Sequence, residues 1–555
     1  MNYVNGLHFN NIRGDIYGGL TAAVVALPLA MSMGVASGVG AIAGMYGAIF
    51  VGLFAALFGG TPAQVSGPTG PMTVVMAVIF IQYTGLFPDD PAKGAALAFT
   101  VVMLGGLFQV AFGLLKFGKY IELVPHPVVS GFMSGIGVII ILLQFGPLLG
   151  LAADSSPLRA AQSIPAYISQ FDFNSLSLGL IALLVVYGVP SFLPKLNKLV
   201  PSPLLALVIG TVSYIVFFAE GSTPIIGDIP SGFPDFHFPI IDSTLFLQMI
   251  ASGLTLAGLG AIDSLLTSLV ADNVTRSQHK PDRELIGQGI GNTIAGLFGG
   301  LPGAGATMRT VVNVKAGGRT PISGALHSVI LLIIVLGAGG LASDIPKAVL
   351  AGILIKVGTD IIDWNYLKRI KYAPRAGVFI MFTVLIITVT IDLLLAFAVG
   401  MIIASFLFMH RITEMQIEHM RPITKPTDGI LLSNDENEIL LKTDNKILLF
   451  HLSGALSFTA AKALIRCHSS VSDYQIMILD LTEVPVIDFT ITRALDDIIL
   501  NTYETNREVL LLGARERVRD TLEKQQVLAH FKDSQIFIKR LAALEYAQNK
   551  VKPEE

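Results

Sequence analysis

The chain has 555 residues, of which 52% are hydrophobic and 14% are charged, and its formal net charge is −3. Soluble domains usually carry about a quarter of charged residues, so this composition excludes a protein folded entirely in water. The small net charge gives no support for a nucleic-acid partner, and a single cysteine, Cys467, excludes an intramolecular disulfide framework.

Apolar runs of about 20 residues, the length that crosses a bilayer as a helix, follow one another from Ile16 to Met409. The first run ends near Val35 without a small-residue cleavage site and is followed at once by another run. We therefore expect a retained span rather than a signal peptide. Glycine and proline lie mostly inside these runs, which predicts close packing and broken helices. We expect an all-α polytopic membrane domain of about 14 spans.

Basic residues gather in alternate loops, with Arg13, Lys280 and Lys371 as examples, whereas the opposite loops contain Asp89 and Asp90 and few basic residues. Loops rich in Lys and Arg stay on the cytoplasmic side of a membrane. Both termini are therefore predicted to be cytoplasmic.

The sequence becomes charged after Arg411, with strand-like apolar runs at 446–452 and 475–480. This change predicts a separate α/β domain. The expected organisation is a cytoplasmic N-terminal segment at 1–14, a transmembrane domain at 15–411, a linker at 412–445 and the soluble domain at 446–555.

Short motifs recur in the same order in the two halves of the membrane part. The pairs are Gly19-Leu20-Thr21 with Gly253-Leu254-Thr255, Leu57-Phe58-Gly59-Gly60 with Leu297-Phe298-Gly299-Gly300, and Thr73-Val74-Val75 with Thr310-Val311-Val312. An odd number of expected spans separates the copies, which inverts the second half. We therefore expect about 7+7 spans in an inverted repeat, an arrangement found in many secondary transporters.

The third and tenth spans begin with segments rich in Gly, Pro, Ser and Thr, at 61–72 and 301–308, and continue into short apolar stretches. Each predicts an extended segment followed by a half-helix. In an inverted pair, two half-helix N-termini meet near the bilayer midplane, where their free N–H groups and positive dipole ends favour an anion. The alternative is that Gly and Pro only allow two kinked helices to pack tightly.

Two charged residues stand out within these apolar segments. Arg309 lies in the first turn of the second half-helix, where a permanent positive charge would face the anion. Asp263 lies in the eighth span, and Thr267 follows it on the same helical face. Their oxygen atoms suit Na⁺ or a proton. The alternative is a structural ion pair between Asp263 and Arg309.

The candidate site residues divide into two sets. For the anion we expect Ser66, Thr69, Gly70, Thr73, Ala306, Thr307 and Arg309. For the coupling cation we expect Asp263, Thr267, Gly305 and Thr307, with Na⁺ as the only bound metal and no other cofactor. Lys356, Asp15 and His327 are given no transport role, because snorkelling or placement near span ends explains them. The sequence has no Walker loop, zinc spacing or nucleophile–base motif, so it does not indicate an enzyme.

These residues resemble the SulP family of anion transporters, to which animal anion exchangers and plant sulfate transporters belong. The matching motifs are Gly67-Pro68-Thr69-Gly70-Pro71-Met72, Gly303-Ala304-Gly305-Ala306-Thr307 and Gly317-Gly318-Arg319-Thr320, together with a C-terminal STAS-like domain. The resemblance is strongest to cyanobacterial sodium-dependent bicarbonate transporters, through Asn11-Ile12-Arg13-Gly14-Asp15 and Glu284-Leu285-Ile286-Gly287-Gln288-Gly289. It implies Na⁺ binding around Asp263 and Thr267, and a bacterial inner-membrane location.

Two positions depart from the bicarbonate subgroup. That subgroup resembles a pattern with Gly at the position of Arg309, whereas sulfate transporters and animal exchangers resemble this chain in having Arg. At Gly67 the subgroup resembles a Ser-Glu-Pro-Thr pattern. Loss of a carboxylate there favours more negative substrates such as sulfate.

The resemblance also implies an elevator, in which a core domain carries the anion past a fixed gate domain, and a homodimer. In STAS relatives a phosphorylatable Ser occupies the position resembling Thr490. The residues that flank Thr490 depart from the usual Asp-Ser-Ser-Gly pattern, so we expect Thr490 to act in folding, dimer contact or regulation without phosphorylation, beside a cytoplasmic partner of this domain. We expect Na⁺-coupled bicarbonate uptake. Sulfate or dicarboxylate transport coupled to Na⁺ or H⁺, an uncoupled exchanger or channel, and a membrane-tethered signalling module are the alternatives.

Overall fold

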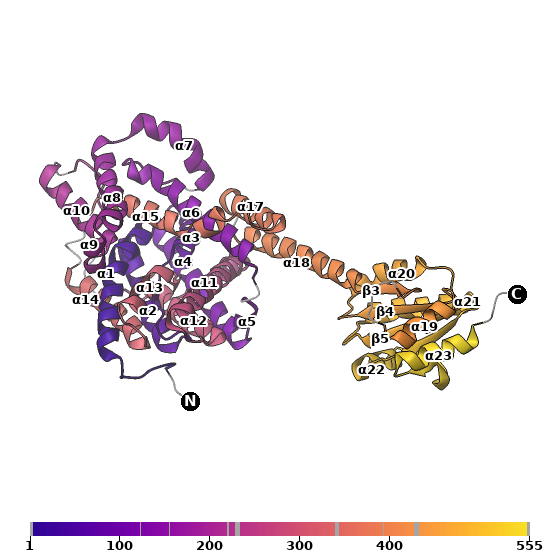
Figure 1. Cartoon of the computed structure of the whole chain (residues 1–555). Coiled ribbons are helices and arrows are strands. Elements are labelled where there is room, and N and C mark those ends of the chain that lie inside the picture. The colour runs from indigo at the N-terminus through magenta and orange to yellow at the C-terminus, as the bar shows by residue number, and fades with distance from the viewer. Residues whose placement is uncertain are drawn as a thin grey trace. The chain divides into compact units, whose positions relative to one another are not determined.

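The computed structural model describes residues 4–121, 124–154, 156–218, 221–227, 234–338, 343–391, 393–426 and 432–551. The chain forms two compact units, Met1–Ile402 and Ile403–Glu555, each with its own packing (Figure 1). The first unit is helical apart from two very short strands, and the second is built on a sheet.

The helices of the first unit follow the apolar runs of the sequence. Their bounds are α1 Ile12–Ala36, α2 Ala41–Phe58, α3 Gly70–Leu86, α4 Pro91–Leu114, α5 Gly118–Ile121, α6 His126–Leu148, α7 Pro157–Gln170, α8 Phe173–Phe192, α9 Pro194–Leu199, α10 Ser202–Phe217, α11 Phe246–Thr275, α12 Pro281–Leu297, α13 Thr307–Lys315, α14 Pro321–Ala338, α15 Lys347–Ile361, α16 Trp364–Lys368, α17 Arg375–Thr390 and α18 Leu393–Glu418, the last continuing into the second unit. Within the described residues, 7 helices are long and apolar enough to cross a membrane, and α3, α10, α14 and α17 are shorter apolar helices. Proline lies in the first turn of α3, α4, α6 and α12, where its missing N–H breaks no helical hydrogen bond.

The membrane helices pack in two groups. One group contains α1 to α4 and α11 to α14, in which α12 lies against α2 and α4, and α14 lies against α1 and α2. The other contains α6, α8, α10, α15 and α17, in which α15 lies against α6 and α8. Contacts of α1 with α10 and α15, and of α3 with α6, form the seam between the groups.

The two short strands lie inside the first group. β1, Ser66–Gly67, follows α2 and precedes α3, while β2, Ala304–Gly305, follows α12 and precedes α13. Helix α3 has 17 residues and α13 has 9, so both broken spans have the order of strand and short helix that the Gly and Pro content predicts. The expectation that the other spans also form a 7+7 inverted repeat stays a prediction.

The second unit has a five-stranded sheet in the order β3-β4-β5-β6-β7. The strands are β3 Met420–Ile423, β4 Ile447–Ser453, β5 Ile476–Glu483, β6 Glu508–Leu512 and β7 Ile536–Phe537, and only the β3–β4 pair is antiparallel. The helices are α19 Asn434–Lys442, α20 Ala461–Ser469, α21 Phe489–Glu504, α22 Glu516–Lys524 and α23 Arg540–Lys550. Alternate residues of β4 point into two apolar cores, one shared with α20, α21 and α22 and the other with α19 and α23.

Part of the segment expected as a linker at 412–445 is folded into this unit. Strand β3 extends the sheet, and α19 begins with a capping box between Ser433 and Glu436 and packs against α23. Within β5, Asp480 is fully buried and is hydrogen-bonded to His451, Thr482 and Arg540.

Candidate functional site

The site is organised by the two broken spans, which pair with each other. Strands β1 and β2 are antiparallel, with Ser66 opposite Gly305 and Gly67 opposite Ala304. Because α3 begins three residues after β1 and α13 begins two residues after β2, the pairing brings both helix starts close together. The first N–H groups of a helix have no acceptor within it. Both helix starts therefore present electropositive ends at the crossing point.

Thr69 and Asp263 connect α3 to the middle of α11. The Thr69 hydroxyl donates a hydrogen bond to Asp263 Oδ2 at 2.6 Å. Asp263 is 6% exposed and Thr69 is 7% exposed, so the contact is buried. The carboxylate of α11 is thereby held beside the start of the first half-helix.

One turn further along α11, Thr267 contacts the start of the other half-helix. Its hydroxyl donates to the Gly305 carbonyl at 2.9 Å, and its oxygen lies 2.7 Å from the hydroxyl oxygen of Thr307. The four residues expected to bind the cation are thus assembled from α11, β2 and α13. Their hydroxyl, carbonyl and carboxylate oxygens are hard ligands of the kind that alkali cations prefer.

Arg309 reaches from the first turn of α13 to the segment after β1. Its Nη2 donates to the carbonyl of Pro68, whereas Nη1 has no hydrogen-bond partner among the described residues. Arg309 is the largest fully buried side chain of the described chain, at 1% exposure. A buried guanidinium with an unused donor group is a ready partner for an anion.

Asp263 and Arg309 do not form the direct ion pair that the sequence left open. Asp263 is bonded to Thr69, and Arg309 is bonded to the Pro68 carbonyl. No ion pair between the two is present in the described residues. Both charges therefore lie at the same site with separate partners.

The remaining expected anion ligands occupy the site with their polar groups partly engaged. Ser66 Oγ accepts a hydrogen bond of 2.6 Å from Gln288, and the Thr73 hydroxyl donates to the Thr69 carbonyl within α3. The Ala306 N–H donates to the Val65 carbonyl at 2.9 Å. Gly70 is the first residue of α3, so its amide has no acceptor within the helix.

A polar stripe on α12 that our sequence interpretation did not assign to the site supports both strands. Glu284, Gln288 and Asn292 follow one another at intervals of four residues and are almost fully buried. Glu284 accepts hydrogen bonds from the N–H groups of Gly60 and Thr61 at 2.8 and 2.9 Å, and Asn292 exchanges two with the backbone of Gly303. The recurrence of polar residues every four positions in an apolar span was the signal available.

Asp15 and His327 are fully buried, which differs from the interfacial placement expected for them. Asp15 accepts hydrogen bonds from the N–H groups of Arg319 and Thr320 and from the Thr320 hydroxyl, so it caps the segment that leads into α14. His327 lies on α14 with its Nε2 unpartnered among the described residues.

Thr490 is far from this site in the chain, in the first turn of α21. It is exposed, and the preceding Asp488 caps the helix by accepting from the Ile491 N–H at 2.9 Å. Its hydroxyl is accessible to a modifying enzyme or a partner. Regulation through Thr490 stays a prediction.

The sequence also matches known families. Residues 12–384, more than half of the chain, match the sulfate permease family. The chain belongs to this family. Residues 438–539 match the STAS domain. The sulfate permease family places the chain among transporters rather than enzymes, and the resemblance inferred from the half-helix motifs is confirmed.

Individual transporters are also similar to this chain over most of its length. The bicarbonate transporter BicA of Synechocystis sp. is 44% identical over 100% of this chain and 98% of its own length. The putative sulfate transporter YvdB of Bacillus subtilis is 30% identical, with 84% of each chain covered.

Solved structures agree with the fold. The transmembrane domain of a cyanobacterial BicA has a TM-score of 0.66 and 47% identity, covering 71% of this chain and 99% of that one. The structure of SLC26A9 has a TM-score of 0.82 over 98% of this chain and 91% of that one, and at 18% identity it shows the shared fold alone.

Proposed function

We propose that this protein takes up bicarbonate together with Na⁺ across a bacterial plasma membrane. The observation that carries the proposal is the assembly of Asp263, Thr267, Gly305 and Thr307 beside the buried Arg309 and the two helix starts. Cation and anion ligands belong to the same small group of elements. The relatives named as bicarbonate transporters support the choice of anion.

Coupling follows from electrostatics at this site. A cation placed among the oxygens of Thr267, Gly305 and Thr307 adds positive charge next to the anion, and the anion in turn stabilises the cation. Moving either ion alone from water into a buried site costs free energy, and this cost is smaller when the other ion is already bound. Binding of one ion therefore raises the affinity for the other, and by linkage the effect is mutual.

The transport step that we propose is an elevator motion along the seam between the two helix groups. The strands, the half-helices and Asp263 all belong to one group, so the site can move as a unit. In this proposal the group of α6, α8, α10, α15 and α17 is the fixed gate. A 7+7 inverted repeat would make the two end states nearly symmetric.

Sulfate is the second candidate, because Arg309 favours it. The unpartnered Nη1 group and the permanent charge of Arg309 stabilise a divalent anion more strongly than a monovalent one. The 30% identical relative named as a putative sulfate transporter supports this alternative.

We further propose that both termini are cytoplasmic, that the protein is a homodimer, and that the STAS domain binds a cytoplasmic regulator. The basic loops of the sequence support the orientation. The exposed apolar residues Val486 and Phe489 next to Thr490 support a binding role for that surface.

The test is uptake of radiolabelled bicarbonate, sulfate and a dicarboxylate into proteoliposomes at several Na⁺ concentrations, with a proton gradient as a separate arm. We expect bicarbonate uptake that rises with an inward Na⁺ gradient. Na⁺-stimulated sulfate uptake in its place assigns the second candidate. Equal uptake with and without cation gradients would identify an uncoupled exchanger or channel, and no uptake of any anion would refute the proposal.

A further inference from the structure

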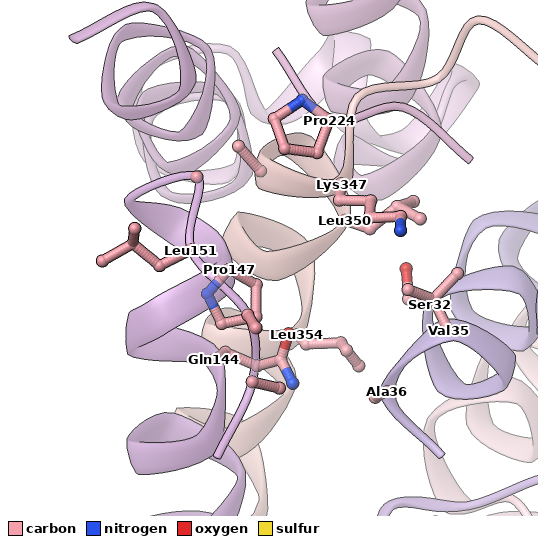
Figure 2. Close-up of a pocket in the computed structure, with 14 residues that line it drawn as sticks. Ser32, Val35, Ala36, Gln144, Pro147, Leu151, Pro224, Lys347, Leu350 and Leu354 are labelled. Atoms are coloured by element: carbon pink, nitrogen blue, oxygen red, sulfur yellow. The ribbon is translucent and has the colours of Figure 1, made fainter. Parts of the chain in front are cut away.

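A cavity lies on the seam between the two helix groups. It has a volume of about 400 Å³ and is lined by the C-terminal ends of α1 and α6, the loop after α6, Pro224 and the N-terminal half of α15 (Figure 2). None of the residues assigned to the half-helix site lines it. The cavity is therefore a distinct feature of the transport domain.

The walls of this cavity are mainly apolar, with Val35, Pro147, Leu350 and Leu354 among them. The polar side chains in the lining are Ser32, Gln144 and Lys347, and the lining contains no carboxylate. Ser32 already donates its hydroxyl to the Pro28 carbonyl at 2.7 Å. The available donors are thus the Gln144 amide and the Lys347 ammonium group.

Gln144 is buried without a partner. The residue is 6% exposed, and its side chain makes no hydrogen bond to any described residue. Figure 2 shows its amide pointing from α6 into the cavity. Its amide is reached from the cavity that it lines, so it is free to donate a hydrogen bond to a ligand there.

Lys347 supplies the positive charge in the lining of the cavity. It is the first residue of α15, its side chain is exposed, and it forms no ion pair in the described part of the chain. Its backbone N–H donates to the Pro224 carbonyl at 2.9 Å, which holds the helix start in place. In Figure 2 the ammonium group points across the cavity toward the end of α1. A single unpaired cation between apolar walls concentrates anions.

The seam connects the cavity with the half-helix site. α1 belongs to the group that contains β1 and β2, whereas α6 and α15 belong to the other group. The start of α3 lies on the same seam, because a methyl group at Gly70 would be 2.7 Å from Ile140 of α6 and 2.9 Å from Ile361 of α15. An anion held in the cavity therefore lies at the same boundary between the two helix groups as the start of α3.

We propose that this cavity is a second anion site, in which Lys347 and Gln144 bind a small inorganic anion before it reaches the half-helix site. The proposal takes its anion class from the proposed transport function and adds a capture step to it. The volume exceeds that of one oxyanion, so the anion is held with part of its hydration shell. Bicarbonate, sulfate and chloride share the required chemistry.

The first experiment compares two charge reversals in the full chain. Lys347→Glu is expected to raise KM for the transported anion about threefold to tenfold at low ionic strength, with kcat little changed and with a smaller effect at high salt. The control is Lys93→Glu in the first turn of α4, since Lys93 does not line the cavity and its ammonium lies 4.2 Å from the Phe87 ring. Equal effects of the two substitutions would overturn the proposal. Lys347→Arg should keep the wild-type KM.

The second experiment measures binding without transport. Cys467→Ser removes the single native thiol, and Ala152→Cys places one at the exposed edge of the cavity, with the exposed Ala92→Cys as the matched control. Sulfate should slow labelling by an anionic methanethiosulfonate at position 152 and not at 92. Lys347→Glu and Gln144→Leu should weaken that protection.

The same protection must survive Arg309→Ala, because the half-helix site is separate. Protection that disappears with Arg309→Ala, or that is equal at positions 92 and 152, would refute the second site. If the wild-type chain transports no anion but position 152 is still protected, the transport proposal fails and the second site stands.

Discussion

The guanidinium of Arg309 fills the space that a side chain at Gly67 would need. A Cβ atom at position 67 would lie 2.6 Å from Arg309 Nη1, which is too close for a real contact, and 3.1 Å from Ala48 Cα, which is tight. Gly67 has φ of +151°, a backbone conformation that other residues rarely adopt. Gly67 and Arg309, the two positions that we expected to differ from the bicarbonate subgroup, therefore lie against each other in the structure.

This contact predicts a specific coupling between two substitutions. Gly67→Ala should displace Arg309 and reduce the anion kcat/KM by about tenfold or more, close to the effect of Arg309→Ala alone. In an Arg309→Ala background, Gly67→Ala should add only the cost of its backbone strain. A double-mutant cycle on anion uptake measures the difference, and additive losses would show that Arg309 does not depend on Gly67.

Arg309 should also discriminate between anions by charge. Because the interaction of a permanent positive charge grows with the charge of its partner, Arg309→Ala should weaken sulfate binding more than bicarbonate binding, by a further factor on the order of ten. Competition of each anion for uptake gives the two affinities. Arg309→Lys is the matched control, since it keeps the charge without the planar group. Unchanged selectivity in Arg309→Ala would count against a ligand role.

Asp263→Asn should abolish the Na⁺ dependence of uptake. The substitution keeps the shape beside Thr69 but removes the negative charge, so Na⁺ affinity should fall on the order of tenfold to a hundredfold. Uptake as a function of Na⁺ concentration measures it, with the exposed Asp89→Asn as the control for a change of net charge. Persistent Na⁺ stimulation would leave Asp263 with a structural role only.

Glu284→Gln should destabilise the membrane domain. The Glu284 carboxylate accepts four hydrogen bonds, from two backbone N–H groups and the side chains of Gln64 and Gln288. In the Gln variant, the side-chain NH₂ group would face N–H donors in place of one carboxylate oxygen, so hydrogen bonds to that oxygen would be lost. The expected loss is about 2–3 kcal/mol, seen as a lower unfolding temperature in detergent. The exposed Glu418→Gln is the control, and an equal unfolding temperature for both variants would contradict the prediction.

Asp480 predicts an acid-sensitive second unit. Burial alone would raise the pKa of Asp480, but hydrogen bonds from His451 and Thr482 lower it from the usual 3.8 to about 2. A carboxyl whose pKa is lowered by folding stabilises the fold above pH 3.8, and this contribution is lost as the pH falls through 2. The contribution is about 2–3 kcal/mol at neutral pH.

The single Cys467 reports on this transition in the full chain, because it is only half-buried and packs on the core of the sheet. Its reaction with a dipyridyl disulfide should accelerate between pH 4 and pH 2 in the wild type, the range set by the two pKa values. Asp480→Asn should react faster at neutral pH and with a flatter pH dependence. A parallel pH dependence of the two proteins would refute the role of Asp480.

The sequence predicted the parts of the site that are local. Gly and Pro at 61–72 and 301–308 indicate extended segments followed by short helices, because these residues act on their own backbone. The spacing of Asp263 and Thr267 places both on one face of a helix, which the structure contains. Both features are readable from neighbouring residues.

The contacts between distant segments were not predictable in the same way. Nothing at Ser66 indicates that it pairs with Gly305, and Asp15 looks interfacial until the amides of Arg319 and Thr320 are placed against it. The stripe of Glu284, Gln288 and Asn292 could have been recognised as a buried face, but its partners could not. Burial of polar groups depends on which element lies opposite, and hydrophobic periodicity does not specify that element.

The pairing of β1 with β2 means that the two half-helices are tied together by their own backbones. Sliding one past the other would break hydrogen bonds in a place where no water can replace them. The proposed motion then has to take place at the seam between the two helix groups, so a covalent bridge between α3 and α6 should stop turnover. In the proposed mechanism, the bound ions therefore move together with both half-helices rather than between them.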